Sequence, residues 1–193
     1  MRAGVGAIAS QARSNPYFGI DGLTLLANGM SAPEALQAML DPDVEIDREQ
    51  RQLIIVDHAG QAAAFTGPHC QPWAGHLIGD GVAAAGNLLV GPETVSAMMA
   101  QFQALERESL GERLVAALEA GQAAGGDRRG RISAALLVAR AGAWPWIDVR
   151  VDSHPDPVAD LRRIFEEFKI AHLDPRREDM ITPPVVYPLF MRS

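Results

Sequence analysis

Cysteine is scarce in the chain, and its scarcity limits where the protein can work. Cys70 is the single cysteine among 193 residues, so no disulfide can form within the chain. A reducing compartment fits such a chain best, and the start at Met1 lacks the apolar core of a signal peptide. No apolar run reaches the length of a transmembrane helix. These absences argue against a disulfide-stabilised secreted domain and a membrane protein, and they predict a cytoplasmic protein.

Positive charge is also in short supply. The chain has 17 Lys and Arg against 24 Asp and Glu, which gives a formal net charge of -7. Nucleic acids and anionic membranes bind positive surfaces, so we expect neither as a partner and favour a small-molecule substrate. The length suits one domain and the 48% of hydrophobic residues suits a packed core. We expect residues 1–172 to form that domain and the Pro-rich residues 173–193 to form a tail.

Apolar periodicity and capping signals predict the order of the helices and strands. Strands are expected over Val5–Gln11, Gln52–Asp57, Gln61–Thr66, Val82–Gly86, Ile132–Arg140 and Ile147–Asp152. Helices are expected around Leu23–Leu26 and after Ser31, Gly91, Ser109 and Asp156. The run Ile132–Arg140 is apolar enough for a central strand buried on both faces, whereas Thr66–Gly81 has little periodicity and is predicted to be a loop. Strand and helix do not alternate strictly, so we predict an α+β fold rather than a doubly wound parallel sheet.

Several short blocks follow one another along residues 2–168 in a familiar order. They are Arg2–Ala12, Ala64–Gly67, Cys70, Trp73–His76, Gly86–Leu89, Gly125–Arg131, Val149–Asp152 and His154–Pro157. Together they resemble the family called domain of unknown function 1028. The resemblance implies the αββα four-layer sandwich of the N-terminal-nucleophile (Ntn) hydrolases, with no cofactor. Enzymes of that fold cleave small amides with a Thr, Ser or Cys at the mature N-terminus, whose own amine acts as the base.

The resemblance has one departure at its start. Relatives carry about a β-hairpin's worth of chain before the block that begins here at Arg2. The bulk of Arg2 should prevent removal of Met1, and no Gly-Thr, Gly-Ser or Gly-Cys dipeptide offers an internal cleavage site. Either the true start lies upstream, or the protein is natively short and does not use this chemistry. A missing hairpin would expose a sheet edge, and this edge and the Pro-rich tail lead us to expect a homodimer.

Asn87 is the candidate catalytic residue. It follows a strand of small residues and precedes a helix start, and in the wider fold a Gly-Asn pair after a strand often serves the oxyanion hole. Its side-chain amide can donate a hydrogen bond to a developing oxyanion. The alternative is a turn residue whose amide satisfies the local backbone.

One loop gathers the candidate substrate-binding residues Thr66, His69, Cys70, Trp73 and His76. Cys70 with His76 is also a possible nucleophile and base, but a buried structural cysteine with capping histidines is the favoured alternative. No metal is expected here, because adjacent residues such as His69 and Cys70 rarely both face one ion and no Cys-x-x-Cys pair supports them.

A basic, Gly-rich stretch from Asp127 to Arg131 supplies the last candidate. Arg128 is expected to bind a substrate carboxylate in bidentate fashion, and the alternative is a solvated turn with a local ion pair. Gly4 and Gly6 do not make a dinucleotide fingerprint, because the third glycine is missing. The sequence thus favours an Ntn-type amidohydrolase, and the alternative is a non-catalytic ligand-binding or assembly protein with the same fold.

Overall fold

The computed structural model describes residues 1–41, 45–142 and 144–173. The strands are β1 (Gly6–Ala12), β2 (Arg51–Asp57), β3 (Ala62–Thr66), β4 (Gly75–Gly79), β5 (Val82–Gly86), β6 (Ala134–Ala139) and β7 (Pro145–Val151). The helices are α1 (Tyr17–Ala27), α2 (Ala32–Leu40), α3 (Glu45–Arg48), α4 (Glu93–Ala104), α5 (Leu110–Ala123) and α6 (Pro157–Phe168), followed by the π-helical turn η1 (Lys169–Leu173). The mixture of helices and antiparallel strands confirms the predicted α+β class.

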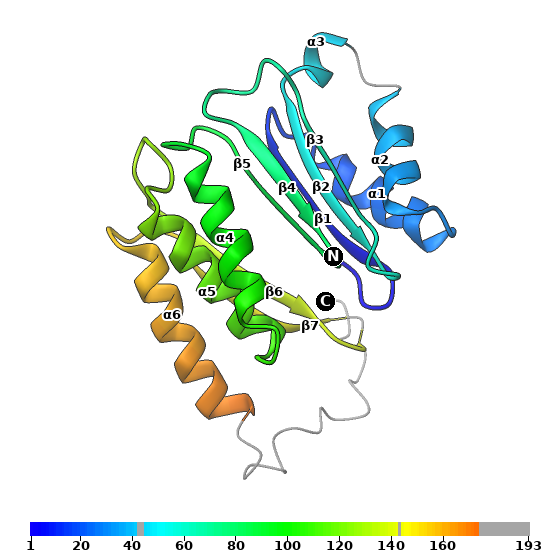
Figure 1. Cartoon of the computed structure of the whole chain (residues 1–193). Coiled ribbons are helices and arrows are strands. Elements are labelled where there is room, and N and C mark those ends of the chain that lie inside the picture. Colours follow the sequence, from blue (N-terminus) through cyan, green and yellow to red (C-terminus); the bar gives the residue numbers. More distant parts are fainter. Residues whose placement is uncertain (42–44, 143, 174–193) are drawn as a thin grey trace, which may run out of the picture.

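An antiparallel sheet in the order β1–β2–β3 forms one side of the molecule. Helices α1 and α2 cover one face of this sheet (Figure 1). Leu53 and Ile55 of β2 are fully buried and pack with Phe18, Leu26 and Met39 of the two helices. Because β2 is the central strand, its side chains are largely buried on both faces of the sheet.

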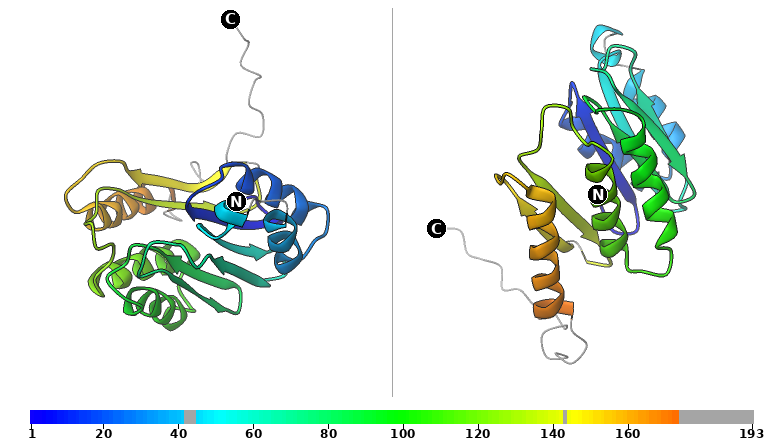
Figure 2. Two further views of the ribbon diagram at one scale, coloured as in Figure 1. Left: turned by 90° about the horizontal axis from the view of Figure 1, so that it is seen from above. Right: turned by 60° about the vertical axis from the view of Figure 1, so that its left-hand side comes forward.

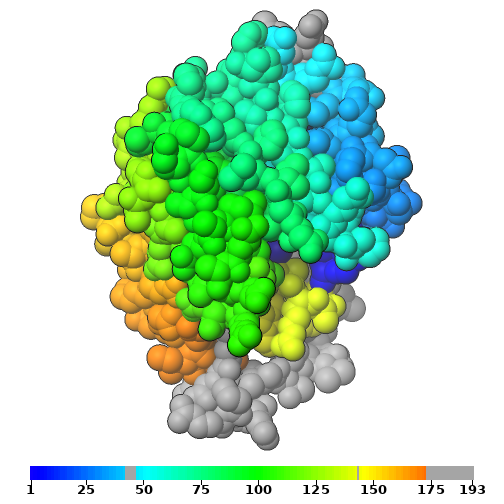
Figure 3. Space-filling view, in the orientation of Figure 1, coloured from blue at the N-terminus to red at the C-terminus, as the bar shows by residue number. Residues whose placement is uncertain are grey.

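The opposite face of this sheet meets the antiparallel hairpin β4–β5, and α4 lies outside that hairpin (Figure 2). Ala84 of β5 packs against Val95 and Met99 of α4. In the space-filling view, α4 and the β4–β5 hairpin form much of the outer surface on this side of the molecule (Figure 3). Side chains of β2 that point away from α1 and α2 are consequently enclosed between the sheet and the hairpin.

A second body consists of the antiparallel hairpin β6–β7 with α5 and α6. Helix α5 packs against both α4 and the hairpin, so it joins the two bodies. Leu161 and Phe165 of α6 are fully buried against Ile147 and Val149 of β7. The segment that leads from α5 into β6 also contacts the first body, through backbone hydrogen bonds from Val90 to Gly126 and from Arg128 to Leu88.

Local sequence signals account for most element boundaries. The Glu34 carboxylate accepts a hydrogen bond from the backbone N–H of Ser31, as the predicted capping box requires, and a second one from the Ser31 hydroxyl. Asn28 closes α1, and Gly29 follows it with φ at +94°, the left-handed conformation that glycine adopts without strain. The expected alternation along β7 is also confirmed, with Ile147, Val149 and Val151 buried.

Two predictions of local structure are wrong. The segment Thr66–Gly81, predicted to be a loop, contains β4, which forms because β5 offers a complementary edge rather than because of its own glycine-rich pattern. The strand β6 is not buried on both faces, because α5 and α6 cover one side only and Ala135 and Leu137 face outward.

The predicted tail, residues 173–193, lies almost entirely outside the described residues. Within the described part, no helix is long and apolar enough to cross a membrane.

Candidate functional site

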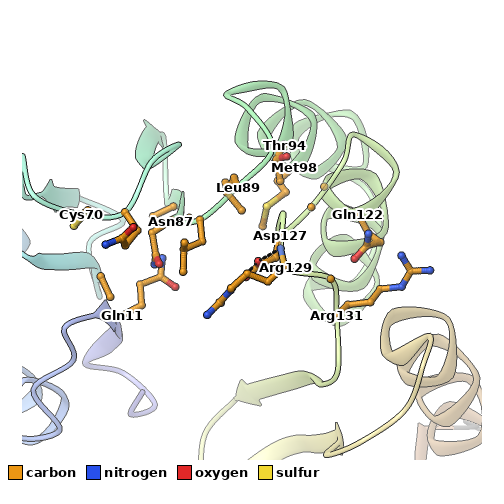
Figure 4. Close-up of a pocket in the computed structure, with 18 of the residues that line it drawn as sticks. Gln11, Cys70, Asn87, Leu89, Thr94, Met98, Gln122, Asp127, Arg129 and Arg131 are labelled. Carbon is orange, nitrogen blue, oxygen red and sulfur yellow. Dashed lines mark hydrogen bonds and ion pairs between the residues drawn. The ribbon is translucent and has the colours of Figure 1, made fainter.

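A cleft of about 900 Å³ opens between the two bodies of the molecule. Its walls come from the ends of β1 and β5, from α4 and α5, and from the segment between α5 and β6. Gln11, Cys70 and Asn87 lie on one side, and Gln122, Asp127 and Arg129 lie on the other (Figure 4). Segments from distant parts of the sequence thus meet around one concave surface, as is typical of a small-molecule site.

Gln52 anchors one wall of the cleft from behind. The side chain of this β2 residue is fully buried, and its Oε1 accepts hydrogen bonds from Gln11 Nε2 at 2.8 Å and from Asn87 Nδ2 at 3.2 Å. Its Nε2 faces three acceptors, the hydroxyl of Thr66 and the carbonyl oxygens of Gly75 and Gly86, at 2.8–3.0 Å. Because carbonyl oxygens can only accept, the orientation of the Gln52 amide is fixed. That orientation leaves Oε1 facing Gln11 and Asn87.

The Asn87 side chain is held by its backbone as well as by Gln52. The next residue, Leu88, has φ at +56°, and its N–H donates to the Gln71 carbonyl at 3.0 Å. On the other side, the Arg128 N–H donates to the Leu88 carbonyl at 2.9 Å. The segment after β5 is therefore fixed between the loop before β4 and the loop after α5. Asn87 uses one amide N–H on Gln52 and keeps a second for the cleft.

The loop after α5 carries a charged pair. Asp127 Oδ1 accepts from the backbone N–H and Nε of Arg129 at 2.8 and 3.0 Å, and Oδ2 lies 2.6 Å from Arg129 Nη2. These hydrogen bonds from Arg129 hold the pKa of the Asp127 carboxyl below its ordinary value. Arg131, nearer β6, bonds Asp156 at 3.0 Å. The side chain of Arg128 is exposed and does not line the cleft, so the structure brings Arg129 rather than Arg128 to this surface.

A second pocket, of about 480 Å³, adjoins the cleft through Cys70 and is also lined by Thr66, Trp73 and His76. Thr66 Oγ1 lies 2.8 Å from His76 Nδ1. Burial lowers the pKa of His76, so the ring is neutral at pH 7. Thr66 Oγ1 also lies 3.0 Å from Gln52 Nε2, so its hydroxyl links the imidazole to the buried amide.

Cys70 does not pair with His76. Its Sγ donates to the carbonyl oxygen of Arg51 at 3.1 Å, and burial raises the pKa of the thiol. A thiolate is therefore disfavoured at this position, and His76 is engaged by Thr66 instead. His69 is an exposed neighbour whose Nδ1 lies 2.9 Å from Glu49. These contacts favour a buried structural cysteine over a catalytic nucleophile.

The structure divides the predicted site residues between the two pockets. Asn87, His69 and Cys70 line the cleft, while Thr66, Trp73 and His76 line the smaller pocket with Cys70. The sequence reading missed Gln11 and Gln52, which lie opposite each other in the β1–β2 register. The sequence signal that could have identified Gln52 was a glutamine at the start of the apolar run that follows Arg51. Across the described residues, no group of three or more His, Cys, Asp or Glu is arranged to hold a metal ion.

Comparison with known proteins adds a family and one solved structure. Residues 1–161 match the model of a family of unknown function, DUF1028. The crystal structure of protein SPO2555 from Silicibacter pomeroyi, assigned to the same family model, is similar with a TM-score of 0.78 and 32% sequence identity. The similarity covers 86% of this chain and 71% of that chain. No curated protein matches the chain.

Proposed function

Since the chain belongs to the DUF1028 family, whose description assigns no reaction, we propose a function from the geometry of the cleft. The cleft binds a small amide, and the protein hydrolyses this amide. In this proposal the free N–H of the Asn87 side chain donates to the oxygen of the amide carbonyl as negative charge develops there. The observation that carries the proposal is the fixed Asn87 amide, held by Gln52 at 3.2 Å in the wall of the cleft. A donor that is already oriented needs no rearrangement when the charge appears.

The arrangement of layers supports the Ntn-hydrolase part of the proposal. Helices α1 and α2, the β1–β3 sheet, the β4–β5 hairpin and α4 follow one another in the order of an αββα sandwich (Figure 2). Asn87 directly follows Gly86 at the end of β5, where the wider fold carries an oxyanion-hole residue. This likeness of architecture is an analogy, whereas the hydrogen bond from Asn87 to Gln52 is specific to these residues.

A second candidate function is ligand binding without catalysis. The surroundings of the hydroxyl and thiol groups that line the cleft favour this alternative. Among the described lining residues these groups belong to Cys70, Thr94 and Ser133, and none has a basic side chain within hydrogen-bonding distance. Nucleophilic catalysis needs such a base, or an N-terminal amine, beside the reacting group. Under this alternative Asn87 holds a carbonyl oxygen of a bound ligand that is not cleaved.

Turnover of simple N-acyl amino acids separates the two functions. For the enzyme, Asn87→Ala should lower kcat by roughly 10²–10³-fold with a smaller change in KM, as removal of an oxyanion donor does. Asn28→Ala, at the exposed end of α1, is the matched control and should leave kcat unchanged. Turnover that Asn87→Ala does not affect would contradict the proposal. Binding of the same compounds without release of amine would favour the ligand-binding alternative.

A cytoplasmic location and a homodimer stay predictions of the sequence. Unused strand edges support the dimer: among the described strands, β6 pairs with β7 alone and β5 with β4 alone. Free edges offer backbone donors and acceptors to a second chain. Light scattering on the purified protein should give the mass of two chains, and a monomer at all concentrations would refute this part of the proposal.

A further inference from the structure

The charges around the cleft have the opposite sign to the charge of the whole chain. Although the formal net charge is -7, the charged groups of the lining include three guanidinium groups, on Arg13, Arg129 and Arg131, and one carboxylate, on Asp127. A concave surface with such an excess attracts anions. Each of these guanidinium groups has a carboxylate within 3.0 Å, so an anionic ligand requires one that keeps free N–H donors.

Arg129 is the guanidinium best placed to meet that charge. Arg13 and Arg131 are held by carboxylates outside the lining, Asp47 at 2.7 Å and Asp156 at 3.0 Å. Among the described residues, Arg129 pairs only with Asp127, two residues away on its own loop, and its side chain is 66% exposed. It lies between that loop and the side of the cleft that holds Gln11 and Asn87 (Figure 4). A guanidinium has five N–H groups, and the Asp127 carboxylate engages two of them, so donors remain for a second carboxylate.

The opposite wall presents donors for an uncharged oxygen. Gln11 and Asn87 both point an amide nitrogen at Gln52 Oε1, so the two nitrogens converge and each keeps one N–H. Between these amides and the loop lie the apolar side chains of Leu89 and Met98. Near Met98, the hydroxyl of Thr94 is buried without a hydrogen-bond partner among the described residues. The surface thus offers donors at one side, an apolar middle and a cation at the other side.

We propose that the cleft selects a small amide that also carries a carboxylate, with Arg129 binding the carboxylate and the Gln11 and Asn87 amides binding the carbonyl oxygen. An N-acyl derivative of an apolar amino acid has this chemistry. The assignment rests on the proposed function for its amide group, whereas the anion preference stands on Arg129 alone. Asp127 competes with the ligand carboxylate for the same guanidinium, because bidentate carboxylate binding uses the same planar fork.

Two probes of nearly the same shape, one anionic and one neutral, test the anion preference. N-acetyl-L-leucine and N-acetyl-L-leucinamide are titrated into the full chain, with binding followed by NMR chemical-shift changes. We expect the acid to bind roughly tenfold more tightly or better, since a charge-assisted hydrogen-bonded pair is lost with the amide probe. Added salt should weaken the acid more than the amide.

Variants then assign the preference to Arg129. Arg129→Gln should remove the advantage of the acid while leaving the neutral probe unchanged, and Asp127→Asn should strengthen binding of the acid by freeing the guanidinium. Arg163→Gln is the matched control, because Arg163 is a similarly exposed arginine that pairs with Asp160 and Glu167 on α6. Equal melting temperatures of all three variants would show that the fold is intact.

The outcomes separate this inference from the proposed function. Equal affinity for acid and amide, an acid preference that survives Arg129→Gln, or no binding of the acid at tens of millimolar would each overturn the inference. Inorganic phosphate that displaces the acid and binds more tightly would also overturn it, since the site would then suit phosphate rather than carboxylate. Arg129-dependent binding of the acid without any release of amine would uphold the inference and refute the amidohydrolase.

Discussion

Two polar groups of residues face each other across the cleft, and they are built in different ways. On the sheet side, Gln52 is fully buried, uncharged and bonded to five partners. On the loop side, Asp127 and Arg129 are charged, partly or largely exposed and bonded mainly to each other. A buried amide that loses its partners is costly to the fold, whereas an exposed ion pair exchanges readily with water or a ligand. We infer that the sheet side fixes geometry and the loop side provides adjustable charge.

The largest expected effect comes from removing the buried amide. Gln52→Leu keeps a side chain of similar size but leaves the amides of Gln11 and Asn87 and the hydroxyl of Thr66 without their shared partner. We expect a loss of about 3 kcal/mol in the free energy of unfolding, measured by urea denaturation. Gln61→Leu, at an exposed position of the β2–β3 turn, is the control and should change stability little. A loss no larger than that of the control would break the contrast between the two sides of the cleft.

A smaller effect is expected from His76, whose imidazole contacts Thr66, one of the hydrogen-bond partners of Gln52. Burial lowers the pKa of His76 below its ordinary value of 6.5, so as pH falls below about 6.5 the unfolded chain binds a proton that the folded protein does not. Stability should therefore decrease with falling pH, from about pH 6.5 down to the lowered pKa of the folded state.

His76→Asn tests this source of pH dependence while keeping a side chain that can form a hydrogen bond with Thr66. The drop in melting temperature between pH 7 and pH 5.5 should be smaller in this variant than in the unmodified chain. His58→Asn, at an exposed turn position, serves as the control and should retain the full drop. If His76→Asn and the unmodified chain lose stability in parallel, His76 is not the group responsible.

The contrast between the two sides also explains what the sequence could predict. Elements with local signals were predicted well, such as α2 with its Ser31–Glu34 capping box and β7 with its alternation. Asn87 was placed by its position after a strand of small residues, and it does line the cleft. The role of Gln52 was not visible, because its partners lie up to 41 residues away and meet it only when the sheet and the hairpin stack. Long-range pairing of this kind leaves no local pattern.

The choice between neighbouring arginines was likewise beyond local reasoning. Arg128 and Arg129 are adjacent and chemically identical, and the sequence favoured Arg128. In the structure the backbone N–H of Arg128 is used on the Leu88 carbonyl, and the Asp127 carboxylate draws the Arg129 side chain to the cleft. Which side chain faces a cavity is decided by the turn geometry, here with φ at +98° for Gly130. The composition of the loop predicts its charge but not which arginine side chain faces the cleft.

The smallest expected effect is on the stability of the loop side. Arg129→Gln removes an ion pair whose arginine is 66% exposed, and screening by water leaves such pairs with little influence on folding. The melting temperature should match that of the unmodified chain within error, in a scan at low salt where surface charges count most. Arg162→Gln provides the contrasting case, because Arg162 is only 22% exposed and joins Glu112 and Glu119 of α5 to α6, so a measurable decrease is expected there. A clear loss of stability in Arg129→Gln would mean that the loop depends on the pair for its shape, and Arg129 would then be a structural residue rather than a free cation for a ligand.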